Sequence, residues 1–212
     1  MIEPLGPREE QILHAAMQVF VEKGRHGARM QEIADRAGVN KAMLHYYFRS
    51  KDNLYATIFR MVLGRYARQF RLSIDTSADV ETILRRFIDG FLEMLNRHPR
   101  LPMFIVRELS EGGAIVGRVV GEMIEEGIFT VPRTMLHIIE ERRDRGEIEN
   151  VDDAVQFVVT LLGGCVYFFI AEPLIGVIFP MEETDRDAFV AARKEALFRH
   201  LYLGIKKRGD DS

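Results

Sequence analysis

Residues 33–48 read IADRAGVNKAMLHYYF, and this stretch decides the fold of the chain. Gly38 stands where the backbone must reverse with a positive φ, which glycine adopts without steric cost. Asn40 follows as the expected N-cap of the next helix. Within that helix Leu44 and Phe48 are about one turn apart, so both can face a small core. The stretch predicts two short helices joined by a sharp turn, a helix-turn-helix.

The second of these helices has an outward face suited to nucleic acid. With Leu44 and Phe48 on the core side, the opposite side is left to Lys41, Ala42, His45 and Tyr46. Cationic side chains contact phosphates, and hydrogen-bonding side chains contact base edges in the major groove. We therefore predict that this helix reads DNA.

Three motifs include this stretch and its surroundings. They are Ile12-Leu13-x-Ala15-Ala16-x-x-x-Phe20-x-x-x-Gly24, Ile33-Ala34-x-x-Ala37-Gly38-Val39 and Leu44-x-Tyr46-Tyr47-Phe48-x-Ser50-Lys51-x-x-Leu54. In the type and spacing of these residues, the chain from about 8 to 63 resembles the tetracycline-repressor (TetR) family of bacterial transcriptional regulators. Residues 64–212 resemble that family only in length and helical texture.

The resemblance implies which residues contact DNA. The matching positions are Arg29, Lys41, Ala42, Met43, His45, Tyr46, Tyr47 and Lys51. Lys41 would contact guanine, Tyr46 a thymine methyl group or a phosphate, and Lys51 a phosphate. Met43 and His45 stand where the family usually has Thr and Tyr, and Arg29 replaces a capping Thr. For Met43 and Tyr47, the alternative to DNA contact is packing within the N-terminal helical domain, residues 1–50, here called the head.

The resemblance also implies a homodimer on a palindromic operator and a small-molecule effector bound among the middle helices. Candidate lining residues are apolar or aromatic side chains with a few polar groups among them, and each is alternatively a core residue or part of a structural ion pair. They are Phe59, Phe87, Phe91, Met94, Phe104, Arg107, Glu108, Met135, His137, Cys165 and Phe169. Ten Met and fourteen Phe favour a mainly hydrophobic ligand.

Composition fits an ordinary globular protein, with 47% hydrophobic and 29% charged residues among 212. The single cysteine, Cys165, excludes an internal disulfide and a multi-cysteine metal site, so we expect a cytoplasmic protein without metal or cofactor. The net charge of −3 disfavours DNA binding, but residues 1–51 hold eight Lys or Arg against six Asp or Glu. This excess of +2 in the head is compatible with a DNA partner.

Helical periodicity continues through the whole chain, so the predicted fold is all-α. The expected helices span 7–23, 30–37, 41–47, 51–72, 78–97, 100–126, 128–145, 151–171 and 185–205. We expect a three-helix DNA-binding domain at 1–50, joined by a long helix to a helical ligand-binding and dimerisation domain at 51–205, and a disordered tail at 206–212. Phe157–Ala171 has no charge but is short for a membrane span, so we expect a buried helix and no membrane partner.

The sequence offers little for catalysis. Its six histidines are scattered, and neither a His-Glu-x-x-His motif nor a phosphate-binding Gly-x-x-x-x-Gly-Lys loop occurs. We therefore predict a dimeric transcriptional regulator and not an enzyme, a repressor released from a palindromic operator by a small, mainly hydrophobic ligand. The alternative is a ligand-sequestering or protein-interaction protein on the same scaffold without specific DNA binding.

Overall fold

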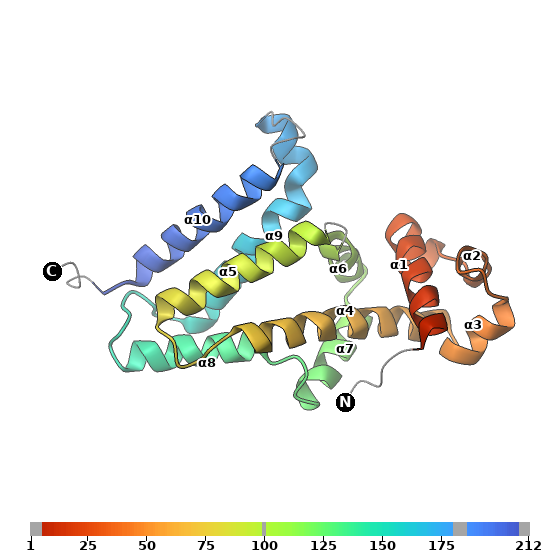
Figure 1. Ribbon diagram of the computed structural model, residues 1–212, viewed down its shortest axis with the longest axis horizontal. Helices are drawn as coiled ribbons and strands as arrows, with labels where there is room; N and C mark the ends of the chain where they lie inside the picture. Colours follow the sequence, from red (N-terminus) through yellow and green to blue (C-terminus); the bar gives the residue numbers. More distant parts are fainter. Residues whose placement is uncertain (1–5, 99–100, 180–185, 208–212) are drawn as a thin grey trace. The chain divides into compact units, whose positions relative to one another are not determined.

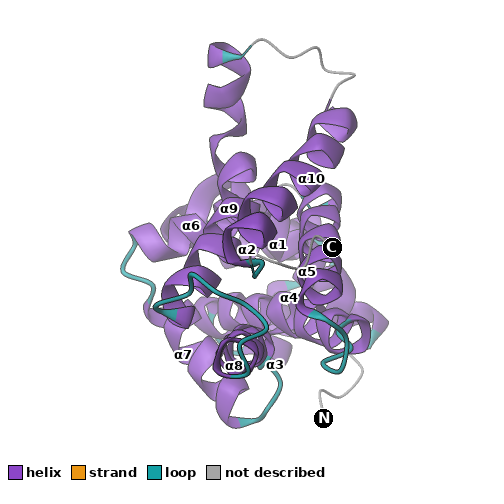
Figure 2. Cartoon of the chain, turned by 90° about the vertical axis from the view of Figure 1, so that its left-hand side faces the viewer, coloured by secondary structure: helices purple, strands orange, loops and turns teal. Residues whose placement is uncertain are grey.

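The computed structural model of the chain describes residues 6–98, 101–179 and 186–207. Every regular element within these ranges is a helix (Figures 1 and 2), which confirms the all-α prediction. The helices are α1 (Pro7–Gly27), α2 (Met30–Arg36), α3 (Lys41–Phe48), α4 (Lys51–Ser73), α5 (Val80–Arg97), α6 (Leu101–Ser110), α7 (Ala114–Glu125), α8 (Val131–Asp144), α9 (Ala154–Ile178) and α10 (Arg186–Ile205).

The helices group into two compact units. The first contains Met1–Tyr66 and Met103–Phe129, and the second contains Ala67–Pro102 and Thr130–Ser212. These two units are defined by the packing of their residues. The boundary at residue 50 was expected between a DNA-binding and a ligand-binding domain, and it stays a prediction. Helix α3, which the sequence predicts to contact DNA, thus shares a compact unit with α7 and most of α6.

Helix α1 buries an apolar stripe at helical spacing, made of Ile12, Ala15, Ala16, Val19 and Phe20. Gly24 interrupts this helix with φ 70° and ψ 174°, a conformation almost restricted to glycine. The regular part of α1 therefore stops at the position where the sequence predicts its end.

The expectation of one helix over 100–126 is wrong. Gly112 and Gly113 have φ values of 99° and 67°, which breaks the segment into α6 and α7. The carboxylate of Glu108 stabilises this break, because its Oε1 accepts a hydrogen bond from the N–H of Ile115 in the first turn of α7, at 3.0 Å. At Gly117, inside α7, an added Cβ would meet no heavy atom within 4 Å, so packing does not require a glycine there.

In the second unit, α9 packs against α5, α8 and α10. The expected end of this helix at Ala171 is wrong, because α9 continues through Pro173 to Ile178. A proline removes one backbone hydrogen bond, but bonding resumes after it: the N–H of Phe179 donates to the carbonyl of Ile175 at 2.8 Å.

Helix α9 is long and apolar enough to cross a membrane, with a mean hydropathy of 2.1 in its most apolar window. A core helix of a soluble protein meets the same criterion. One side of α9 does lie in the core, through Val158, Leu161, Cys165, Phe168 and Phe169. The other side exposes apolar residues at helical spacing, namely Val155, Val159, Tyr167 and Leu174. The helix thus has one covered and one uncovered apolar face.

The start of the tail predicted to be disordered is bonded to the second unit. Lys206 forms an isolated antiparallel bridge with Ile148, and the ammonium of Lys207 donates to the carbonyl of Gly146 at 3.2 Å. Residues 208–212 lie outside the described residues.

Candidate DNA-binding surface

The turn between α2 and α3 is closed by two backbone hydrogen bonds. The N–H of Val39 donates to the carbonyl of Ala34 at 3.0 Å, and the N–H of Gly38 donates to that of Asp35 at 3.2 Å. Gly38 has a φ of 63°, so this is the helix-ending motif in which glycine takes the left-handed position. The sharp turn predicted from the sequence is therefore present, with glycine where positive φ is required.

Helix α3 begins at the predicted cap. The side-chain oxygen of Asn40 accepts a hydrogen bond from the N–H of Met43 at 2.7 Å. Leu44 is fully buried and Phe48 is 6% exposed, so these two residues fix the inner face of α3. This anchoring determines which side of the helix solvent can reach.

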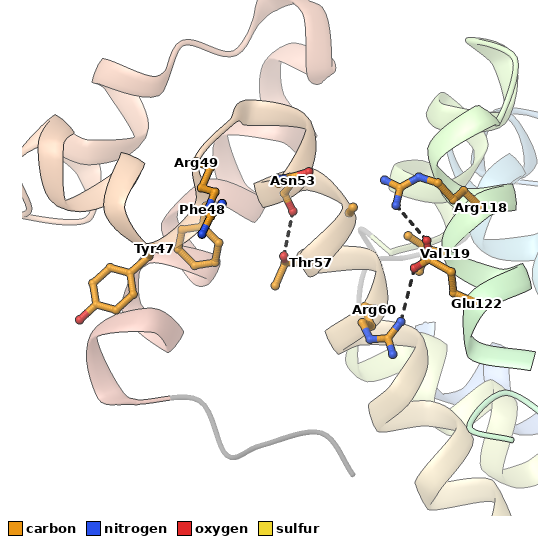
Figure 3. A pocket seen from close by; sticks show the side chains of 10 residues that line it. Tyr47, Phe48, Arg49, Asn53, Thr57, Arg60, Arg118, Val119 and Glu122 are labelled. Carbon is orange, nitrogen blue, oxygen red and sulfur yellow. Dashed lines mark hydrogen bonds and ion pairs between the residues drawn. The ribbon is translucent and has the colours of Figure 1, made fainter. Parts of the chain in front are cut away.

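The residues predicted to contact DNA lie mainly on the outer face. Lys41, Ala42 and His45 are exposed, while Met43 is half-buried. Tyr46 is 81% exposed and Tyr47 38%. In Figure 3 the ring of Tyr47 points away from the labelled residues of α4 and α7. Helix α3 therefore presents a cation, an imidazole and two phenols to solvent.

A strained turn links α3 to α4. Arg49, at the centre, has φ 60° and ψ −48°, and the N–H of Ser50 donates to the carbonyl of Phe48 at 2.6 Å, which defines a γ-turn. The ring Nδ1 of His45 donates to the carbonyl of Arg49 at 3.0 Å. The side-chain oxygen of Ser50 then caps α4 by accepting a hydrogen bond from the N–H of Asn53 at 3.1 Å. The turn is thus held by groups on both of its sides.

Two other predicted DNA contacts lie beside this helix. The ammonium of Lys51 donates to the carbonyl of Ala28 at 3.1 Å and to that of His26 at 3.4 Å. Two of its three protons are therefore engaged within the unit, which leaves one for a phosphate. Arg29 is exposed at the N-cap position of α2 and makes no capping hydrogen bond.

The basic residues of the head divide into paired and unpaired groups. On α1 and α2, Lys23 pairs with Glu32 at 2.7 Å, and Arg36 pairs with Glu22 at 2.8 Å. Within the described ranges, by contrast, no carboxylate partner is found for Arg29, Lys41 or Arg49. Apart from Arg8 at the start of α1, the cations without a carboxylate partner in described residues 6–51 thus lie on and around α3, although the chain as a whole is acidic.

A cavity of about 320 Å³ lies between the α3–α4 turn, α4 and α7 (Figure 3). Arg118 and Arg60 converge on Glu122, at 3.0 and 3.6 Å. Arg60 also hydrogen-bonds Glu126, which lowers the pKa of that carboxyl. The cavity is therefore polar, and most of its charges are already compensated. Its lining residues are Tyr47, Phe48, Arg49, Asn53, Ala56, Thr57, Arg60, Arg118, Val119 and Glu122.

The residues predicted to bind a ligand belong to both units. In the first unit, Phe59 and Phe104 stack with their ring centroids 4.5 Å apart, and Phe104 and Arg107 line a cavity of about 290 Å³. In the second unit, Phe87 and Phe91 pack with centroids 5.6 Å apart. The other second-unit residues are buried, except His137, which is exposed; they are Met94, Met135, Cys165 and Phe169.

Glu108 and Arg107 instead connect α6 to α1. Glu108 is 1% exposed, and its Oε2 lies 3.8 Å from Nε of Arg25. The guanidinium of Arg107 donates to the carbonyl of Val21 at 3.4 Å and lies over Gly24, where a Cβ would approach its Nε to 2.7 Å. Both side chains therefore position the end of α1.

Two residues in this region are not among the DNA contacts expected from the sequence. Arg49 is a cation at the centre of the γ-turn, and Arg25 joins α1 to Glu108 and, at 3.2 Å, to Asp52. The position of Arg49 directly before the Ser50 cap was a usable signal. The pairing of Arg25 depends on distant parts of the chain and leaves no local pattern.

Comparison with known proteins agrees with this geometry. Residues 12–58 match the family model described as "Bacterial regulatory proteins, tetR family". This match assigns the segment 12–58 to the tetR family of regulators. The matched residues of the TetR-family domain begin in α1 and end in α4, so they contain the whole helix-turn-helix.

Curated proteins similar to this chain include a transcriptional activator and a transcriptional regulator. The HTH-type transcriptional activator FasR of Mycolicibacterium smegmatis is 37% identical over 92 residues, which are 43% of this chain and 42% of FasR. The HTH-type transcriptional regulator RutR of Escherichia coli K12 is 30% identical over 112 residues, which are 53% of this chain and 52% of RutR. The chain thus spans about half the length of these curated relatives.

The likeness to solved structures extends over nearly the whole chain. The transcriptional regulator FadR of Bacillus subtilis, in complex with stearoyl-CoA, has a TM-score of 0.72 at 20% identity. The match covers 92% of this chain and 98% of that one. At this identity the likeness shows a common fold.

Proposed function

We propose that this protein is a dimeric, DNA-binding transcriptional regulator that α3 directs to a palindromic operator. The observation that carries the proposal is the outer face of α3, where Lys41 has no carboxylate partner in the described residues and Tyr46 is 81% exposed. As a repressor it would bind the operator without ligand and release it with ligand. A cytoplasmic location follows from this role.

Selection of bound fragments from a random DNA duplex library tests the proposal directly. We expect a symmetrical consensus, because two copies of α3 related by a twofold axis would contact half-sites about 34 Å apart. Recovery of no consensus would favour the alternative, a ligand-sequestering or interaction protein on this scaffold.

Substitutions in α3 test which residues carry the binding. Lys41→Ala and Tyr46→Ala should each weaken operator binding without changing thermal stability, because both side chains are exposed. Lys51→Ala should reduce the slope of log affinity against log salt by about 0.9, because Lys51 is the residue predicted to hold a phosphate. Lys23→Ala is the matched control, since Lys23 belongs to the same unit but is paired with Glu32. An equal loss in the control would contradict the assignment.

The proposed dimer forms through α9 and α10. The apolar stripe of α9, with Val155, Val159 and Tyr167 each at least half exposed, needs a partner that excludes water. On α10, the exposed Leu203 is 60% accessible. A second copy of the chain offers the same stripe, which makes a twofold interface self-complementary. This partner, rather than a membrane, agrees with the burial of the opposite side of α9 in the core.

The proposed effector is a small, mainly hydrophobic molecule. Two observations support it: the aromatic cluster of Phe70, Phe87 and Phe91 in the second unit, and the stearoyl-CoA held by a FadR protein of the same fold. Stearoyl-CoA should therefore weaken operator binding, by about 5- to 150-fold if the coupling is of ordinary size. Coenzyme A alone is the control for the nucleotide part. An equal effect of both compounds would contradict a hydrophobic effector.

A further inference from the structure

His45 is held by a hydrogen bond that fixes the position of its ring proton. The Nδ1 of His45 lies 3.0 Å from the carbonyl oxygen of Arg49. A carbonyl oxygen only accepts, so Nδ1 must carry the hydrogen. In the neutral ring, Nε2 is then left without a proton and is a hydrogen-bond acceptor.

The accepting carbonyl is itself well fixed. Arg49 occupies the centre of the γ-turn, its N–H donates to the carbonyl of His45 at 2.9 Å, and the N–H of Ser50 closes the turn onto Phe48. Reversing the tautomer would place the lone pair of Nδ1 against the carbonyl oxygen of Arg49, which is repulsive. The turn therefore selects the tautomer, and the ring orientation follows from it.

His45 also lies on the part of α3 that would enter a groove. It is exposed, it follows Lys41 by one helical turn, and its neighbour Tyr46 is 81% exposed. Its Nε2 has no hydrogen-bond partner within the described chain. An acceptor on this face can bind only a donor.

The major groove contains two kinds of base donor. These are the N4 amino group of cytosine and the N6 amino group of adenine, whereas guanine and thymine present acceptors there. We propose that His45 is a specificity-determining residue whose Nε2 accepts a hydrogen bond from the exocyclic amino group of a cytosine or adenine in each operator half-site. This inference rests on the proposed function, because it requires that α3 binds DNA.

Base analogues test the hydrogen bond on the selected operator. Each adenine of a half-site is replaced in turn by purine, which lacks the 6-amino group, and each cytosine by 2-pyrimidinone, which lacks the 4-amino group. Binding is measured at pH 8. At one position the wild-type protein should lose about 3- to 10-fold in affinity, the value of a single neutral hydrogen bond. The analogue that causes the loss identifies the base.

Two variants separate base reading from support of the turn. His45→Asn keeps an N–H donor where Nδ1 stood but has no acceptor at the position of Nε2, so its affinity should not depend on the amino group. His45→Gln places an amide oxygen near the position of Nε2 and should restore that dependence. Thermal unfolding of both variants shows whether the fold is kept.

The outcomes separate this inference from the proposed function. Equal losses in the wild type and in His45→Asn, or no loss with any analogue, would overturn the role of His45 while α3 still binds the operator. Absence of any sequence-specific binding by the wild type would overturn both. Loss of the amino-group dependence in His45→Asn, with its recovery in His45→Gln, supports the inference.

Discussion

Residue 38 adopts a backbone conformation that favours glycine over residues with a side chain. Gly38 has a φ of 63°, and the turn that begins α3 depends on its left-handed conformation. Gly38→Ala should therefore lower the free energy of unfolding by about 1 kcal/mol, the usual cost of alanine in this region. Urea denaturation measures the change.

Gly117→Ala is the matched control for this prediction. Gly117 lies inside α7, and a Cβ added there would meet no heavy atom within 4 Å. Alanine should stabilise the protein at this position by up to about 1 kcal/mol, because it has the higher helix propensity. Stabilisation by Gly38→Ala, or equal effects of the two changes, would show that the turn does not require glycine.

The thiol of Cys165 predicts a dependence of stability on pH. Burial raises its pKa to about 12 from an ordinary 9.0, against a smaller opposing effect of Arg193. Between these values the unfolded chain loses the proton and the folded chain keeps it, so stability is full below pH 9 and falls as pH rises. At pH 10 this contribution should be about 1.4 kcal/mol smaller than at pH 7.

Comparison with Cys165→Ala isolates this effect from other titrations. The cavity left by the variant costs stability equally at both pH values, whereas the fall between pH 7 and pH 10 should be smaller than in the wild type. An identical fall in both proteins would mean that the thiol is not protected by burial. The raised pKa also disfavours a nucleophilic thiolate at this residue.

Glu108 of α6 contacts two other helices, and the two contacts can be tested separately. Its Oε1 caps α7 at Ile115, and its Oε2 faces Arg25 of α1. Glu108→Gln keeps the accepting oxygen and removes the charge, so it should cost about 1 kcal/mol, because Arg25 retains Asp52 as a partner. Glu108→Leu also leaves the N–H of Ile115 unsatisfied and should cost about 1–3 kcal/mol more. Urea denaturation of both variants gives the order.

Glu111→Gln is the control for the loss of charge alone, since Glu111 also faces Arg25, at 3.9 Å, but does not cap α7. It should have a smaller effect than Glu108→Leu. If Glu108→Gln proved as destabilising as Glu108→Leu, the charge would matter more than the cap.

The elements predictable from sequence were those specified by local chemistry. Gly38 with Asn40 determines the α2–α3 turn, and the buried stripe of α1 follows helical periodicity, so both appear where the sequence places them. The division of 100–126 into two helices depends on the cap that Glu108 supplies across a break, and the length of α9 on its tolerance of Pro173. Such effects of packing and distant contacts leave no periodic signal.

The candidate site follows the same rule. The outward position of Lys41, His45 and Tyr46 is a consequence of helix geometry and was therefore predictable. The hydrogen bond of His45 to Arg49 and the engagement of Lys51 with backbone carbonyls depend on how neighbouring helices end. These details decide which protons are free to bind DNA.

For the whole molecule, binding to a palindrome requires that two copies act together. Val159 lies on the exposed apolar stripe of α9 and is 58% exposed, so replacing it by glutamate should leave the fold of one subunit almost unchanged. In the proposed interface the same charge would be removed from water without a partner. Val159→Glu should therefore sediment as a monomer with near-wild-type thermal stability. It should lose about 100-fold or more in operator affinity, because each DNA-binding domain would then bind its half-site independently.

The matched control is Leu109→Glu, which adds the same charge at an apolar residue of α6 that is 57% exposed and outside the stripe. This variant should remain a dimer and keep its operator affinity, because a solvated charge costs little. Sedimentation velocity and operator titration on both variants complete the comparison. A dimeric Val159→Glu would place the interface elsewhere.

Binding of the wild type to phosphatidylcholine vesicles, which carry no net charge, would instead assign the α9 stripe to a membrane if Val159→Glu abolished it, since apolar burial drives both associations.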